Sequence, residues 1–98
     1  MNDQDIDKKV AAAIKDVIRG EVGPFGLVNV TVTAAEDHAG DPSLMIDVEY
    51  REGGQAIDTK VVAGLVSKLR ERLWTMGERR FPYIRHHFSE KQKVVGYP

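Results

Sequence analysis

Three histidines are the residues of this 98-residue chain best suited to acid–base chemistry: His38, His86 and His87. An imidazole titrates near neutral pH and can act as a general base. His86 and His87 adjoin in a predicted strand, so they point to opposite faces and cannot bind one metal ion as a simple pair. Spacing assigns neither of them an acidic partner, and no serine has the context of a nucleophile elbow. We therefore expect no catalytic residue and no enzymatic activity. The alternative is a small hydrolase or metal protein around His86 or His38.

Other ligand-binding patterns are weak. Asp37, His38 and Asp41 lie within five residues, but their spacing does not match a calcium loop, which alternates oxygen ligands and ends in a bidentate glutamate. The chain has no cysteine, which excludes disulfides and thiolate-bound metals. Three glycines between residues 20 and 26 follow a predicted helix, whereas phosphate loops precede one. We predict no metal and no cofactor.

Cations and aromatic rings alternate in the C-terminal part of the chain. The cations are Arg79, Arg80, Arg85, Lys91 and Lys93, and the rings are Phe81, Tyr83 and Phe88. Single-stranded nucleic acids favour this mixture, although a pI near 6.3 is below the basic range of a dedicated binder. A sheet edge beside such a segment is also a docking surface for another protein. We predict a protein-interaction module, with a single-stranded RNA-binding domain as the alternative. The predicted interaction residues are Arg79, Arg80, Phe81, Tyr83, Arg85 and His87.

Charge is divided unevenly along the chain. Residues 1–58 hold five Lys/Arg and twelve Asp/Glu, a balance of −7, while residues 59–98 hold nine and three, a balance of +6. An acidic half can attract a basic half within a monomer or across a twofold dimer. We expect a homodimer, and homodimerisation would also stabilise a modest core.

A hairpin over residues 27–51 organises the predicted fold. Its apolar residues are Val28, Val30, Val32, Ala34, Leu44, Ile46, Val48 and Tyr50, and they alternate with polar residues. This period of two predicts an antiparallel sheet that is buried on one face. Leu27 and Met45 fall on the polar face, where they could seed a subunit contact. A lone hairpin is marginal in water, so helices must cover its apolar face.

Helical spacing on either side of the hairpin supplies that cover. Residues 1–20 carry an amphipathic stripe, with Asn2 or Asp3 as the expected N-cap and Gly20 as the expected left-handed residue after the helix. A second helix is predicted over residues 58–77. Asp58 is its expected cap and Gly77 its expected terminator.

Trp74 falls at the edge of the apolar stripe of this second helix. Its position favours a place in the core or in an interface over a ligand platform.

A third strand is predicted over residues 82–88, at a sheet edge because Pro82 cannot complete a central ladder. A right-handed crossover makes it parallel to the second strand, and we expect it beside the first strand. Residues 89–98 are expected to form a tail. The whole chain, 1–98, is thus one predicted α+β domain in α-β-β-α-β order, with a small three-stranded mixed or antiparallel sheet and two helices on one face. No secretory signal or membrane-spanning run is present, so we expect a cytoplasmic location.

Two stretches resemble a small uncharacterised bacterial family. They are Asp41–Val48, in a hairpin of the pattern D-x-x-G-D-P-x-L-x-I-x-V, and Gly77–Ile84, matching G-E-x-R-F-P-x-[IV] after a long helix. The similarity covers roughly residues 28–88. The resemblance implies a gene beside small HEPN-type proteins, some of whose relatives are ribonuclease toxins, and hence an antitoxin-like partner role without catalysis. No catalytic residue transfers from it.

Overall fold

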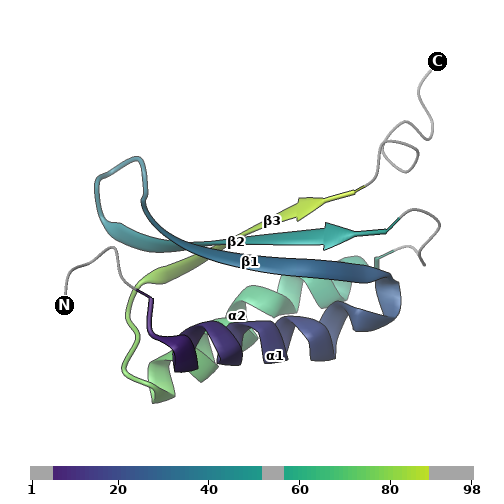
Figure 1. The fold of residues 1–98 in the computed structure, drawn as a ribbon, viewed down its shortest axis with the longest axis horizontal. Coiled ribbons are helices and arrows are strands. Elements are labelled where there is room, and N and C mark those ends of the chain that lie inside the picture. Colours follow the sequence, from purple (N-terminus) through teal and green to yellow (C-terminus); the bar gives the residue numbers. More distant parts are fainter. Residues whose placement is uncertain (1–5, 52–56, 89–98) are drawn as a thin grey trace.

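The computed structural model describes residues 6–51 and 57–88. The elements are α1 (Lys8–Val22), a 3₁₀ turn (Gly23–Phe25), β1 (Leu27–Glu36), β2 (Pro42–Tyr50), α2 (Thr59–Thr75) and β3 (Phe81–His87). Both helices lie side by side under one face of a three-stranded sheet, so the domain has two layers (Figure 1). The predicted α+β class and element order are confirmed.

The sheet is mixed, with the strand order β1-β2-β3. β1 runs antiparallel to β2, where Val30 pairs with Val48, and β3 runs parallel to β2, where Ile46 pairs with Ile84. The expectation that the third strand lies beside the first is wrong. The crossover through α2 returns the chain directly beside the strand it left, as short connections usually do. β2 is therefore central, and β1 and β3 are the edges.

Alternation along the strands places the core as the sequence predicts. The buried side chains that form it are Val10, Ile14, Ile18, Val22, Val30, Leu44, Ile46, Val48, Tyr50, Leu65, Leu69 and Leu73. Residues of both helices and of β1 and β2 thus share one cluster, with Ile84 of β3 packed against it. The free energy of the fold rests on this shared burial, because neither the hairpin nor the helices would be stable alone.

The first residues of β1 depart from simple alternation. The ladder slips between Leu27, which pairs with Tyr50, and Asn29, which pairs with Glu49. This bulge reverses the faces of the preceding residues. Val28 is 62% exposed, while Leu27 packs against the core, so both predicted orientations are wrong.

α1 begins later than predicted. Asp7 is the N-cap, and its carboxylate accepts a hydrogen bond of 2.7 Å from the backbone N–H of Lys9. The expected caps Asn2 and Asp3 lie outside the described residues.

α1 also ends later than predicted, at Val22 rather than at Gly20. Val22 is fully buried, and Glu21 forms an ion pair of 2.7 Å with Lys68 of α2. These two contacts hold the last turn in helical conformation. The left-handed residue is Gly26, with φ at 89°, after the 3₁₀ turn.

α2 follows the prediction closely. Asp58 accepts a hydrogen bond of 2.8 Å from the backbone N–H of Lys60, and Gly77 has a φ of 79° just after the helix. Neither α1 nor α2 is long and apolar enough to cross a membrane.

β3 begins at Phe81 and ends at His87, one residue earlier at each end than predicted. Pro82 is buried and pairs with Leu44, and its strand is an edge strand as expected. The predicted tail 89–98 lies outside the described residues.

Candidate interaction surface

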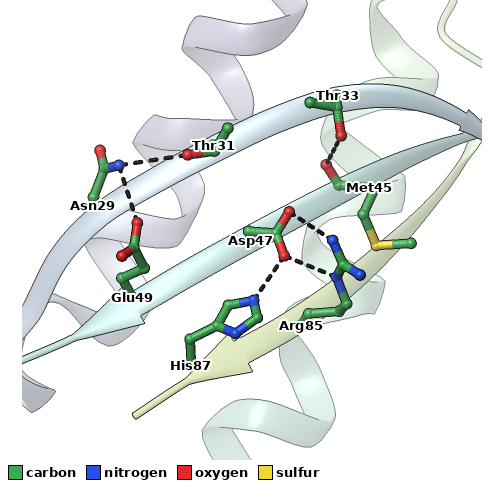
Figure 2. Close-up of polar contacts among 8 residues, drawn as sticks. All are labelled: Asn29, Thr31, Thr33, Met45, Asp47, Glu49, Arg85 and His87. Carbon is green, nitrogen blue, oxygen red and sulfur yellow. Dashed lines mark hydrogen bonds and ion pairs between the residues drawn. The ribbon is translucent and has the colours of Figure 1, made fainter. Parts of the chain in front are cut away.

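The sheet face opposite the two helices carries three groups of polar contacts (Figure 2). Asn29 on β1 donates a hydrogen bond of 3.2 Å to Glu49 on β2, and one of 3.4 Å to Thr31. Thr33 reaches the backbone carbonyl of Met45 at 3.5 Å. The polar residues of the predicted alternation therefore form a face on which side chains contact groups of the neighbouring strand.

Asp47 is the centre of this face. Its carboxylate accepts hydrogen bonds of 2.8 and 3.1 Å from Nε and Nη2 of Arg85, and one of 2.7 Å from Nε2 of His87 (Figure 2). An ionised carboxylate can only accept, so Nε2 of His87 carries its proton here. These hydrogen bonds, chiefly those of Arg85, lower the pKa of Asp47, and the pKa of Arg85 is raised in return.

Spacing in the sequence assigned no acidic partner to His87, and the structure shows one. The parallel ladder pairs Asp47 with Arg85 and Glu49 with His87, which brings the β2 carboxylates alongside Arg85 and His87 of β3. The pairing was hidden because Asp47 and His87 are 40 residues apart, and only the register joins them.

A second group of residues gathers where α2 ends and β3 begins. We call it the cation–aromatic surface: Arg70 and Trp74 of α2, Arg79 of the connecting loop, and Phe81 and Tyr83 of β3. The Arg79 guanidinium lies 4.5 Å from the centre of the Trp74 ring. The Arg70 guanidinium lies 5.1 Å from that of Phe81. The rings of Phe81 and Tyr83 are 4.8 Å apart.

These rings are accessible to a partner. Trp74 is 64% exposed, and Phe81 and Tyr83 are each 37% exposed. A small hollow of about 70 Å³ between Trp74 and Phe81 joins the helical part of the surface to the strand part. Trp74 was predicted to lie in the core or in an interface. Its exposure rules out the core, and a place in an interface stays a prediction.

The turn that positions this surface is held by a partly buried ion pair. Arg80 donates from Nε at 2.9 Å and from Nη2 at 2.8 Å to the carboxylate of Glu78, and its side chain is only 15% exposed. The Arg80 hydrogen bonds hold the pKa of Glu78 below its usual range, against the effect of burial. Gly77 supplies the left-handed residue at which the chain leaves α2.

The six predicted interaction residues therefore divide into three groups. The first group lies at alternate positions of β3 on the open face of the sheet: Phe81, Tyr83, Arg85 and His87. Arg79 lies over the ring of Trp74, and Arg80 stabilises the turn through Glu78. Sequence reasoning missed Arg70. The signal was its spacing of four residues from Trp74, which places both on one side of the helix, next to the buried stripe.

His86 lies on the helix side of β3, as its alternation with His87 predicts. The Oη of Tyr50 is 2.8 Å from Nδ1 of His86, and the ring of Phe88 stacks on Tyr50 with 4.9 Å between centres. Burial raises the pKa of Tyr50 to about 12, and it lowers the pKa of His86. A neutral imidazole that accepts a hydrogen bond from the phenol satisfies both groups.

The residues considered for a metal site do not assemble one. Asp37 accepts hydrogen bonds from the backbone N–H groups of Ala39 and Asp41 and so closes the hairpin turn. The Asp41 hydrogen bond is the main reason that the pKa of Asp37 is lowered. Within residues 6–51 and 57–88, no group of three or more acidic, histidine or cysteine side chains could hold a metal ion.

Comparison with protein families and with curated proteins adds no relative. No family model matches the sequence, and the search of curated proteins finds no match.

Proposed function

We propose that this chain is a protein-binding module whose partner docks on the cation–aromatic surface and along the outer edge of β3. The observation that carries the proposal is the exposure of Trp74, Phe81 and Tyr83 next to an edge strand. Tryptophan, tyrosine and arginine are the residues that most often dominate the energy of protein interfaces. An edge strand adds a row of backbone groups that a partner strand can pair with.

The charge balance of this region favours a protein over a nucleic acid. Arg80 is bound to Glu78 and Arg85 is bound to Asp47, so two of the predicted cations already neutralise carboxylates. Affinity for a nucleic acid backbone depends on cations that replace the counterions of several phosphates. Single-stranded RNA remains the second candidate because the guanidiniums of Arg70 and Arg79 lie over rings, an arrangement that also suits base stacking.

The resemblance to the bacterial family gives the partner its chemical class. In this proposal the partner is the product of an adjacent gene, a toxin-like protein that the chain neutralises in the cytoplasm by occupying its surface. The chain itself contributes binding and no catalytic step.

Co-expression with the product of the adjacent gene tests the proposal. We expect one co-eluting complex, and we expect Trp74→Ala and Tyr83→Ala each to weaken it at least tenfold, the scale of a hot-spot residue. Val28→Ala is the control, because it truncates an exposed side chain on β1, the opposite edge of the sheet. Two proteins that elute separately would count against the antitoxin-like role. A complex that tolerates both substitutions would show that the surface is wrongly chosen.

The RNA candidate is tested with a fluorescent single-stranded RNA oligomer at two salt concentrations. Phosphate-driven binding must weaken as salt rises. No binding, or binding that does not change with salt, removes this candidate.

A further inference from the structure

β1 is a sheet edge that lacks charge and proline along most of its length. From Leu27 to Ala35 it has neither, and valine and threonine fill five of its ten positions. β3, the other edge, includes Pro82 and Arg85. Charged residues and proline are the usual protection of an edge strand against pairing with another chain, so β1 is the less protected edge.

The bulge does not interrupt this edge, because it is confined to the first residues of the strand. Asn29–Glu36 pairs with Pro42–Glu49 in an unbroken register. The backbone of these eight residues is therefore also regular along the outer edge, the edge that faces away from β2. The bulged residue, Val28, stands 62% exposed at the start of the strand. An exposed valine and a regular strand that is uncharged up to Ala35 together form a surface suited to a further strand.

Opposite charges lie at the two ends of this strand. At its start, Lys15 and Arg19 of α1 line a hollow of about 340 Å³ with Leu27–Val30. At its end stands Glu36. None of these three charges takes part in an ion pair within the described chain. They cannot meet in one copy, because ten residues of strand separate the two ends by about 30 Å.

We propose that a second copy of this chain pairs antiparallel with β1, about a twofold axis near Thr31 and Val32. In an antiparallel self-pair the start of each strand meets the end of the other, so Glu36 of each copy reaches the hollow that holds Lys15 and Arg19. A strand from another protein would need an acidic residue placed to meet Lys15 and Arg19. A second copy of this chain has that residue, Glu36, and the twofold axis forms the contact twice. The result is one six-stranded sheet, within the usual size of open sheets.

Mass measurement of the full chain by light scattering tests the pairing. We expect about twice the monomer mass of 10.9 kDa, and we expect Thr31→Lys to shift the mass to 10.9 kDa because it places two lysines beside the axis. Thr31 is exposed, so circular dichroism should show an unchanged fold. Ala63→Lys, which adds the same charge at an exposed position on α2, is the control that should stay dimeric. A wild-type chain that is monomeric at every concentration would overturn the proposal, and so would a Thr31→Lys variant that dimerises normally.

A charge exchange tests the orientation. Glu36→Lys should weaken dimerisation roughly tenfold, because it removes two symmetric ion pairs and introduces repulsion. Adding Lys15→Glu and Arg19→Glu should restore it. If Glu36→Lys leaves the dimerisation constant unchanged, the antiparallel twofold arrangement is wrong. The result is independent of partner binding at β3, since the monomeric Thr31→Lys variant keeps that edge intact.

Discussion

Asp47 on β2 and Arg85 on β3 face each other across the parallel ladder and share two hydrogen bonds of 2.8 and 3.1 Å. The pair ties the edge strand to the centre of the sheet on the face that no described helix covers. It also neutralises the cation nearest the middle of that face. The predicted interaction residues of β3 therefore carry less net positive charge in the fold than their sequence indicates, because the carboxylate of Asp47 offsets Arg85.

Substituting Asp47→Asn should therefore destabilise the fold modestly. The free energy of unfolding should fall by roughly 0.5–1 kcal/mol, because Arg85 is more than half exposed and solvent screens the pair. The pKa of Asp47 is lower in the folded chain than in the unfolded chain, so its contribution is complete above about pH 4 and is lost as the pH falls through the folded pKa. Urea unfolding at pH 7 and pH 3 should show that the free energy of unfolding falls less between these pH values in the variant than in the wild type. Equal acid losses would show that the pair does not stabilise the folded state.

The Tyr50–His86 contact predicts a pH dependence near neutrality. Burial lowers the pKa of His86 in the folded chain, so protonation favours the unfolded chain, and stability should decline as the pH falls below about 6.5. His86→Phe should remove this decline, and Tyr50→Phe should cost about 1 kcal/mol at pH 7 through loss of the hydrogen bond. Thermal unfolding between pH 5.5 and pH 7.5 measures both effects. His87→Phe is the neighbouring control on the open face, and this variant should still lose stability as the pH falls. If His86→Phe also still loses stability, another group causes the pH dependence.

Two valines in β1 test the bulge. Val30 is 6% exposed and belongs to the core, whereas Val28 is 62% exposed. Val30→Ala should lower the free energy of unfolding by about 2 kcal/mol, the cost of two buried methyl groups and the cavity they leave. Val28→Ala should change it by less than about 0.5 kcal/mol in dilute protein. Urea unfolding compares them directly, and equal losses would mean that the strand alternates without a bulge.

The sequence predicted the layers of the fold because burial imposes a period on each element. Alternation placed Val30, Ile46 and Val48 against the helices, where all three are buried. Local chemistry placed Asp58 and Gly77, since a cap and a left-handed residue act within one turn of the helix that they bound.

The features that escaped prediction depend on residues distant in the chain. Gly20 looked like a helix terminator, but burial of Val22 carries α1 past it. The reversal of Leu27 and Val28 follows from one irregular pair in the ladder. The candidate surface was predicted only in part for the same reason. Its β3 residues lie near one another in the sequence and were predicted together. Trp74 belongs to α2, and the turn held by Glu78 brings it next to these residues.

Hydrogen exchange of the chain with and without its co-expressed partner tests the central proposal most directly. Docking along the edge of β3 should slow amide exchange in Phe81–His87 and in the last turns of α2 around Trp74, because the partner covers these groups. Leu27–Glu36, at the other edge, should keep the exchange rates that it has without the partner. Protection confined to Leu27–Glu36, or no added protection in β3, would contradict the account.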